Sequence, residues 1–183
     1  MKLVPTRRTD YGIRAMIYLA QQTTGELSKA DDIADAMQLP RNFLPRVLQD
    51  LQRARLVHSR PGGTGGYALS RPPEEISILD IVEALEGSLA NVDCALRGGP
   101  CRWNDVCALH WVWSEARAAL AASLRAGTLA RVADDDRRIS SGSAEVPADT
   151  HRRRQSGIAV VPVDRVRRRP TPAADRPARQ RIP

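Results

Sequence analysis

Three cysteines carry the most distinctive chemistry in this 183-residue sequence. Cys94, Cys101 and Cys107 are grouped in one short segment, and His110 follows the last of them as Cys107-x2-His110. Clustered thiols beside an imidazole typically bind metal when the thiols stay reduced. Three thiolates and a fourth ligand suit an iron–sulfur cluster or a structural zinc ion, whereas three partly buried thiols are the alternative. A zinc ribbon is less favoured because the segment has no Cys-x2-Cys pair.

The rest of the composition predicts a cytoplasmic protein. No run of about 18 apolar residues is present, so we expect no membrane span. The N-terminal sequence MKLVPTRRTDYGIR lacks the apolar core of a signal peptide. An odd number of cysteines also argues against a disulfide framework. Because no catalytic triad, phosphate loop or pair of catalytic carboxylates stands out, we do not expect an enzyme.

The charge distribution favours a polyanionic partner. The formal net charge is +7. Residues 1–71 carry 11 basic and 6 acidic side chains, whereas residues 72–133 carry 5 and 8. A basic N-terminal third is typical of nucleic-acid binding, although a solvated basic surface would give the same pattern.

Helical periodicity and turn residues predict a mainly α protein with one small β-hairpin. The expected helices cover residues 11–22, 28–37, 42–54, 77–86 and about 105–129. The expected hairpin strands are residues 56–59 and 66–70, joined by a glycine-rich turn.

Helix ends are marked by characteristic residues. Ser28 and Ser77 each have an acidic residue three positions later, which predicts capping boxes. Asn42 is the expected N-cap of the third helix, which places Pro45 in the first turn, where proline is tolerated. Gly87 is the expected stop of the fourth helix.

This order of elements predicts a winged helix-turn-helix that binds double-stranded DNA. The second helix of such a unit enters the major groove, and arginine on the hairpin suits the minor groove. The alternatives are an ordinary surface helix and an ordinary flexible turn. The candidate DNA-contacting residues are Arg41, Asn42, Phe43 and Arg46 of the helix, and Arg60, Thr64 and Gly65 of the hairpin.

Residues 1–130 resemble the Rrf-two family of winged-helix transcription regulators, the group that contains IscR, NsrR and RirA. The resemblance rests on Thr9-Asp10-Tyr11, on the hairpin Ser59–Tyr67 and on Ile81-Val82…Leu85-Glu86-Gly87. It implies a DNA-binding regulator, most often a repressor, that works as a homodimer through a long dimerisation helix. The expected seam of that helix contains Leu109, Val112, Ala116, Leu120, and Ser123 or Leu124.

The resemblance also bears on the cysteines. Cluster-bearing members have three cysteines in this position, so Cys94, Cys101 and Cys107 are implied ligands of a [2Fe-2S] or [4Fe-4S] cluster. The first interval has six residues where members often have five. The resemblance offers two fourth ligands: His110, as in IscR-like members, or Asp10 of the partner subunit, as in NsrR-like members. A winged-helix regulator whose cysteines bind zinc or act as redox thiols is the alternative.

Three segments follow from these patterns. Residues 1–87 are the expected winged helix-turn-helix domain, and residues 88–133 the expected cysteine loop and dimerisation helix. Residues 134–183 contain 12 arginines and 6 of the 13 prolines, with no Phe, Tyr, Trp, Leu or Met. We expect this tail to be disordered, because it cannot bury enough apolar surface to offset the cost of ordering the chain.

Overall fold

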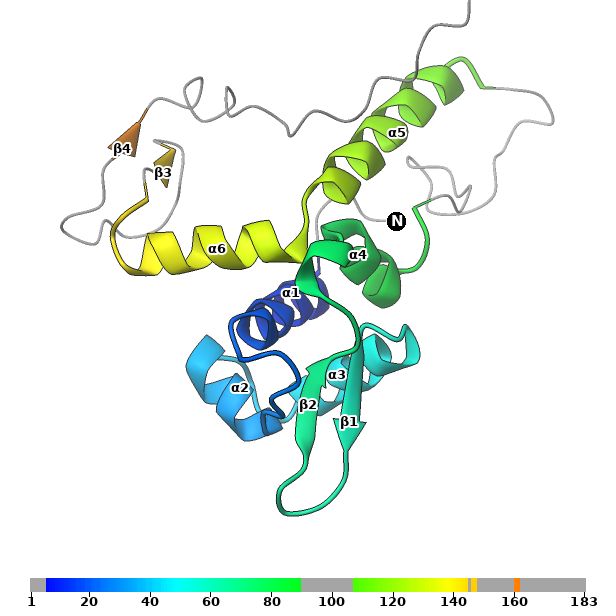
Figure 1. Cartoon of the computed structure of the whole chain (residues 1–183). Coiled ribbons are helices and arrows are strands. Elements are labelled where there is room, and N and C mark those ends of the chain that lie inside the picture. The colour runs from blue at the N-terminus through cyan, green and yellow to red at the C-terminus, as the bar shows by residue number, and fades with distance from the viewer. Residues whose placement is uncertain (1–5, 90–106, 145, 148–159, 162–183) are drawn as a thin grey trace, which may run out of the picture. The chain divides into compact units, whose positions relative to one another are not determined.

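The structure is a computed structural model that describes residues 6–89, 107–144, 146–147 and 160–161. The chain divides into two compact units, residues 1–134 and 135–183. The described helices and strands are α1 (Arg7–Ala20), α2 (Ala30–Met37), α3 (Leu44–Arg53), β1 (Val57–Arg60), β2 (Gly66–Leu69), the 3-10 turn η1 (Pro73–Glu75), α4 (Ile78–Glu86), α5 (His110–Ala126), α6 (Leu129–Ser140), β3 (Val146–Pro147) and β4 (Val160–Val161). The expected mainly α architecture with one small hairpin is confirmed (Figure 1).

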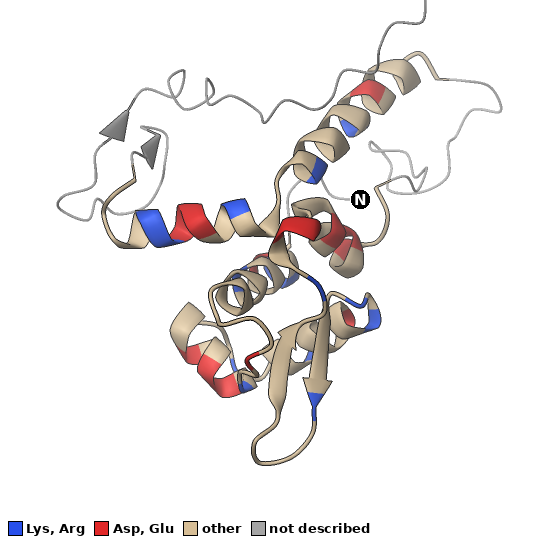
Figure 2. Ribbon diagram, viewed as in Figure 1, with Lys and Arg blue, Asp and Glu red and all other residues tan. Residues whose placement is uncertain are grey.

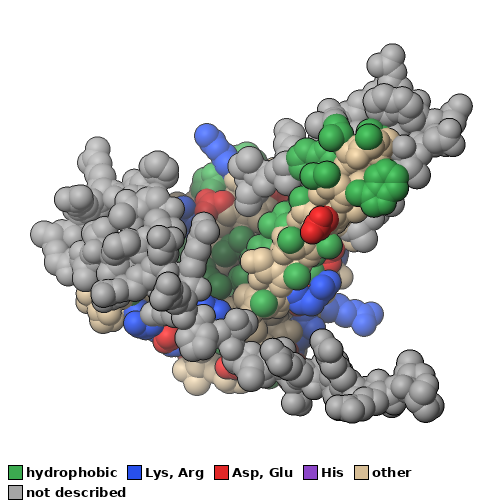
Figure 3. Space-filling model, turned by 90° about the horizontal axis from the view of Figure 1, so that it is seen from above, with side chains coloured by type: hydrophobic (Ala, Val, Ile, Leu, Met, Phe, Trp, Pro, Cys, Tyr) green, Lys and Arg blue, Asp and Glu red, His purple; other side chains and the backbone are tan. Residues whose placement is uncertain are grey.

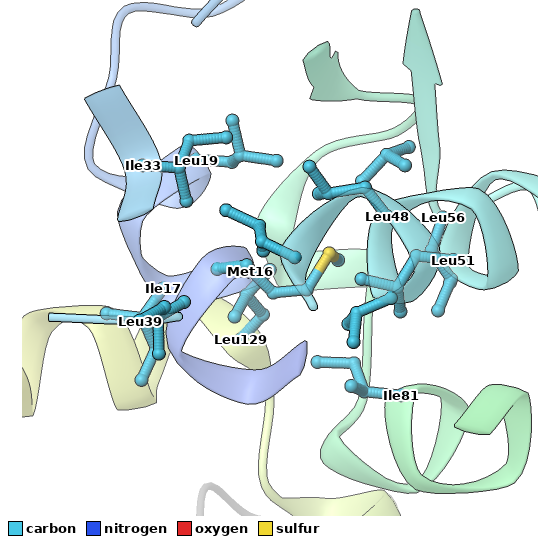
Figure 4. Packing of buried hydrophobic residues seen from close by; sticks show 14 of the residues in the cluster. Met16, Ile17, Leu19, Ile33, Leu39, Leu48, Leu51, Leu56, Ile81 and Leu129 are labelled. Carbon is cyan, nitrogen blue, oxygen red and sulfur yellow. The ribbon is translucent and has the colours of Figure 1, made fainter. Parts of the chain in front are cut away.

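A core of aliphatic side chains joins the helices of the first unit (Figure 4). α1 contributes the fully buried Met16, α3 contributes Leu48 and Leu51, and α4 contributes Ile81. Leu129, at the start of α6, is also fully buried in this cluster. Burial of such side chains supplies the main force that holds α1, α3 and α4 together.

The hairpin is fixed to the segment between α1 and α2. β1 and β2 pair antiparallel, with Ser59 opposite Tyr67. On the other edge of β2, the backbone N–H of Ser28 donates to Tyr67 O at 2.9 Å, and Tyr67 N–H donates to Ser28 O at 2.8 Å. A Cβ atom on Gly66 would lie 2.5 Å from Ser28 O. Residue 66 must therefore be glycine for the two backbones to approach this closely.

Two of the predicted caps are wrong. Lys29 is the N-cap residue of α2, not Ser28. Ser28 instead pairs with Tyr67 through its backbone. α3 begins later than expected, so its N-cap is Phe43 and not Asn42. Pro45 still lies in the first turn, as predicted.

The caps of α4 are confirmed. The Ser77 hydroxyl accepts from Asp80 N–H at 3.1 Å, and the Asp80 carboxylate accepts from Ser77 N–H at 2.9 Å. Gly87 follows the last helical residue with a φ of 86°. This reciprocal arrangement satisfies backbone donors that the helix itself leaves unpaired.

The predicted long helix is interrupted near its end. α5 runs from His110 to Ala126, and α6 begins at Leu129. Between them, Gly127 O accepts from Ile78 N–H at 2.8 Å, and Leu129 N–H donates to Ile76 O at 2.7 Å. Backbone pairing with the segment before α4 therefore replaces the helical hydrogen bonds. The expected start near residue 105 is wrong, because Leu109 is the N-cap and His110 the first residue of α5.

The expectation of disorder from residue 134 is wrong for residues 134–140, which belong to α6. The first half of α6 is anchored by Leu129 and Ala133, both buried in the core. In the second half, Arg138 and Asp135 form an ion pair one turn apart at 3.7 Å. Most of the remaining tail lies outside the described residues, where its expected disorder stays a prediction.

Candidate nucleic-acid interface and cysteine segment

α3 has one buried face and one exposed polar face. Leu44, Val47, Leu48 and Leu51 are buried. Arg46, in the first turn of the helix, is exposed and forms no hydrogen bond or ion pair among the described residues. Its guanidinium is therefore available to an external acceptor.

A polar hollow of about 750 Å³ runs beside this exposed face. It lies between α3 and β2, and its lining includes Asn42, Arg46, Arg53 and Tyr67. Arg46, Asn42 and Tyr67 supply hydrogen-bond donors to this surface, whereas Arg53 is paired with Asp50, which also lines the hollow. Such a surface suits a polyanion with exposed acceptor atoms.

Arg41 precedes α3 and is held by Asp35 of α2. Arg41 Nε donates to Asp35 Oδ1 at 3.1 Å, and Arg41 Nη2 donates to Oδ1 at 2.7 Å and to Oδ2 at 2.6 Å. The hydrogen bond to Asp35, and then the negative charges of Asp35 and Asp31, hold the pKa of Arg41 above its usual value. Acidic residues lie along α2 (Figure 2). Sequence reasoning missed Asp35, because an aspartate six residues before an arginine has no distinctive spacing.

Phe43 is a large apolar side chain left in solvent. It is the N-cap residue of α3, and 57% of it is exposed. It lies between Asn42 and the first turn of α3, next in sequence to other candidate DNA contacts. An exposed aromatic ring at the start of this helix offers an apolar contact beside polar ones.

The hairpin places a cation at the end of β1 (Figure 2). Arg60 and Thr64 are both exposed. Gly65 is buried within the turn, where its N–H donates to Gly62 O at 3.0 Å. A Cβ atom on Gly65 would lie 2.1 Å from Arg60 O, so this glycine is needed by the turn itself. Direct contact of Gly65 with DNA stays a prediction.

The structure describes only part of the predicted metal-ligand set. Cys107 is half-buried, and its carbonyl accepts from His110 N–H at 2.8 Å across a single turn. His110 is exposed at the first position of α5, with its ring edge-on to Trp111. Cys94 and Cys101 lie outside the described residues. Within the described part of the chain, no three potential metal ligands come together.

Asp10, the alternative fourth ligand, lies on α1. Its Oδ1 accepts from Arg14 Nε at 3.0 Å, one helical turn away. Both side chains are about half exposed, 47% each. The carboxylate therefore has a local partner and remains accessible to a second one.

Glu86 connects α4 to α1 and was missed by sequence reasoning. Its Oε1 accepts from the hydroxyls of Thr6 and Thr9. Burial of Glu86 works to raise its pKa. The hydrogen bonds from Thr6 and Thr9 outweigh this effect, so the pKa of the Glu86 carboxyl lies below its usual value.

The family model described as an iron-dependent transcriptional regulator, Rrf2, matches residues 5–135. The chain belongs to the Rrf2 family. It is 41% identical over 127 residues to an HTH-type transcriptional regulator of Mycobacterium tuberculosis, covering 69% of this chain and 78% of that protein. It is 36% identical over 115 residues to the HTH-type transcriptional regulator NsrR of Shouchella clausii, covering 62% and 77%.

Solved structures of Rrf2-type regulators share the fold. CymR of B. subtilis, the global cysteine regulator, superposes with a TM-score of 0.62 at 28% identity, covering 72% of this chain and 97% of CymR. IscR of T. potens gives 0.59 at 28% identity, covering 73% and 88%. An oxidized form of Staphylococcus aureus CymR gives 0.58 at 28% identity, covering 72% and 97%. The expected winged helix-turn-helix architecture is thereby confirmed.

Family membership establishes the general activity. This Rrf2 protein is a DNA-binding transcription regulator of the winged-helix type. Among the described residues, no helix is long and apolar enough to cross a lipid bilayer.

Proposed function

We propose that this protein is an iron–sulfur-dependent repressor that binds a double-stranded operator in the cytoplasm as a homodimer. The observation that carries the DNA-binding part is the exposed, donor-rich start of α3 beside the hairpin. The function is regulatory and requires no catalysis, in line with relatives that are transcription regulators.

The start of α3 is the proposed base-reading element. In winged helix-turn-helix proteins the N-terminal residues of this helix contact base edges in the major groove. Asn42 and Arg46 have the geometry for paired hydrogen bonds to purines, and both are exposed. Arg41 and Phe43 flank them. Together these four residues form the proposed reading surface.

The hairpin is the proposed minor-groove element. Arg60 is exposed at the end of β1, where a guanidinium is attracted by the negative potential of a narrow groove. Thr64 and the backbone at Gly65 are the proposed neighbouring contacts. The pairing of Tyr67 with Ser28 ties this hairpin to the rest of the domain, which limits the positions that Arg60 can reach.

α5 is the proposed dimerisation helix. None of its side chains is buried, and Trp111 and Val112 are 65% and 64% exposed. Hydrophobic side chains gather along the helix in Figure 3. Of the expected seam, Leu109, Val112, Ala116 and Ser123 are exposed, whereas Leu120 and Leu124 are half-buried. A second copy of α5 would cover the exposed apolar residues.

The cysteine segment is the proposed cluster site. Three thiolates with an imidazole form a donor set that suits iron–sulfur ligation. Cys107 lies in the turn that leads into α5, and its carbonyl accepts from the backbone N–H of His110, the first residue of the helix. We assign Cys94, Cys101, Cys107 and His110 as ligands, with Asp10 as the alternative to His110. A bound cluster would supply a redox-active centre sensitive to iron supply, oxidants or nitric oxide. Because His110 begins α5, a constraint on Cys107 also constrains the start of the proposed dimer helix.

A thiol-based regulator is the second candidate. The observation that favours it is the fold shared with CymR, one structure of which is an oxidized form. In this case Cys94, Cys101 and Cys107 would respond as thiols, or bind zinc, without iron. The DNA-binding surface would be the same.

Anaerobic purification separates these candidates. An iron–sulfur protein has broad visible absorption and near-stoichiometric iron and sulfide, whereas a zinc or thiol protein is colourless. Selection from random duplex DNA should yield a palindromic operator, because a two-fold dimer reads two half-sites. Binding should weaken steeply with salt. A purified protein without iron contradicts the iron–sulfur part of the proposal. A protein that enriches no sequence contradicts the operator-binding part.

A further inference from the structure

The ion pair between Arg41 and Asp35 fixes one edge of a guanidinium in a defined direction. Arg41 Nε and Nη2 both donate to the Asp35 carboxylate, at distances from 2.6 to 3.1 Å. A two-point contact of this kind restrains the plane of the guanidinium as well as its position. Both side chains remain more than 60% exposed, at 62% and 61%.

The opposite edge of the same guanidinium is open. Nη1 donates no hydrogen bond among the described residues, whereas Nε and Nη2 both donate to Asp35. The two hydrogens of Nη1 are therefore the donors left for an external ligand. They suit an acceptor such as the O6 or N7 atom of guanine or a phosphate oxygen.

The position of the pair is also informative. Asp35 belongs to α2, and Arg41 lies in the turn that leads into α3. A flexible arginine loses side-chain freedom when it binds a ligand, and a prior restraint reduces this cost. Asp35 therefore acts on a candidate DNA contact from outside the reading helix.

We propose that Asp35 is a positioning residue for DNA recognition: it holds Arg41 so that its free Nη1 meets an acceptor in the operator. The inference rests on the proposed DNA-binding surface. Asp35 itself does not touch DNA, and its carboxylate repels phosphates. Its contribution is therefore to discrimination between sequences and not to overall affinity.

The test compares binding to the selected operator with binding to a scrambled duplex of the same length and composition. The full chain is used, purified anaerobically, with wild type, Asp35→Asn, Arg41→Ala and the double variant. We expect Asp35→Asn and Arg41→Ala each to lower the operator-to-scrambled affinity ratio about fivefold or more. The double variant should be no worse than Arg41→Ala alone, because the two residues act as one unit.

Two further variants separate positioning from charge. Asp32→Asn removes the same charge from α2, and Asp32 makes no hydrogen bond or ion pair among the described residues. It should leave the ratio unchanged and strengthen binding to both duplexes alike. Arg41→Lys keeps the charge but cannot make the planar two-point contact with Asp35, so it should lower the ratio while keeping the salt dependence. Equal urea midpoints would show that the variants fold normally.

Three results would overturn the proposal. An unchanged or increased operator-to-scrambled ratio for Asp35→Asn would mean that Asp35 only competes with DNA for the Arg41 guanidinium. Additive losses in the double variant would mean that the two residues act separately. If Arg41→Ala keeps the ratio while wild type still selects an operator, Arg41 is not a reader and the proposed function stands without this inference. If wild type selects no sequence, the DNA-binding proposal fails first.

Discussion

Thr9 and Glu86 join the first turns of α1 to the last residue of α4. The fully buried Thr9 donates its hydroxyl hydrogen bond to Glu86 Oε1. Glu86 directly precedes Gly87, beyond which the chain leads toward the cysteines. Arg8, the neighbour of Thr9, forms an ion pair with Asp50 of α3. Adjacent residues of α1 therefore contact both the end of α4 and the proposed reading helix.

Glu86 should make stability depend on pH in a defined direction. Its folded-state pKa is lowered, so the carboxylate stabilises the fold above the unfolded pKa. This contribution is lost as the pH falls through the folded value. We expect Glu86→Gln to reduce the free energy of unfolding by about 1 kcal/mol at pH 7. The difference from wild type should shrink once the pH falls below the unfolded-state pKa of about 4.3, and should disappear below the folded-state pKa of Glu86.

Urea unfolding of the metal-free chain at several pH values measures this effect. Glu74→Gln is the control, because Glu74 is exposed and makes no hydrogen bond among the described residues. Its difference from wild type should stay near zero throughout. A Glu86→Gln difference that does not shrink between about pH 5 and pH 2 would show that the ionised carboxylate is not the stabilising form.

Phe43 should contribute a preference for thymine. Its ring is 57% exposed at the start of α3, and an apolar side chain there can contact the thymine methyl group. Replacing single thymines of the operator by deoxyuridine removes only that methyl group. One such replacement should weaken wild-type binding about threefold or more, and should not affect Phe43→Ala. If the replacement weakens binding of wild type and of Phe43→Ala equally, another residue contacts the methyl group.

The two candidate fourth ligands should respond differently to substitution. His110→Ala is expected to change the visible spectrum and the stability of the cluster, because His110 lies one turn from Cys107. Asp10→Ala is expected to leave both unchanged. Cys94→Ser, Cys101→Ser and Cys107→Ser should each abolish the cluster, since thiolates are the principal donors. If Asp10→Ala changes the spectrum and stability of the cluster and His110→Ala does not, Asp10 is the fourth ligand.

Removing residues 141–183 should preserve the fold and lower only non-specific affinity. This truncation keeps all of α6 and deletes ten arginines with four acidic residues. With fewer arginines near the phosphates, the truncated protein releases fewer counterions when it binds DNA. The salt dependence of its binding to scrambled DNA should therefore be shallower. Thermal unfolding and size-exclusion chromatography check fold and assembly. An insoluble truncated protein would show that the tail has a structural role.

Gly66→Ala should destabilise the hairpin through its contact with residue 28. The new Cβ atom would lie 2.5 Å from Ser28 O, a backbone atom that cannot move freely. We expect a loss of about 1–3 kcal/mol in the free energy of unfolding. Gly63→Ala is the matched control, since nothing lies within 4 Å of its added Cβ atom. Equal stability of the two variants would contradict the tight approach of β2 to Ser28.

Local rules in the sequence determined several features without the structure. The Ser77 capping box and the stop at Gly87 were predicted correctly, because their partners lie within one helical turn. Helical spacing of Phe43, Val47, Leu51 and Ala54 predicted the buried face of α3 only in part, because Val47 and Leu51 are buried whereas Phe43 and Ala54, at the ends of the helix, are exposed. The motifs in the first helix, the hairpin and the segment that ends at Gly87 indicated the family for the same reason, since they are properties of the linear chain.

Tertiary structure decided the features that depend on distant segments. Ser28 could cap α2 or pair with Tyr67, and only the approach of the hairpin selects the second. The break at Gly127 likewise requires the segment before α4. Glu86 meets Thr9 from 77 positions away. Sequence periodicity reports which side of a helix is buried, but a hydrogen bond between two elements depends on where packing of the whole core places their ends.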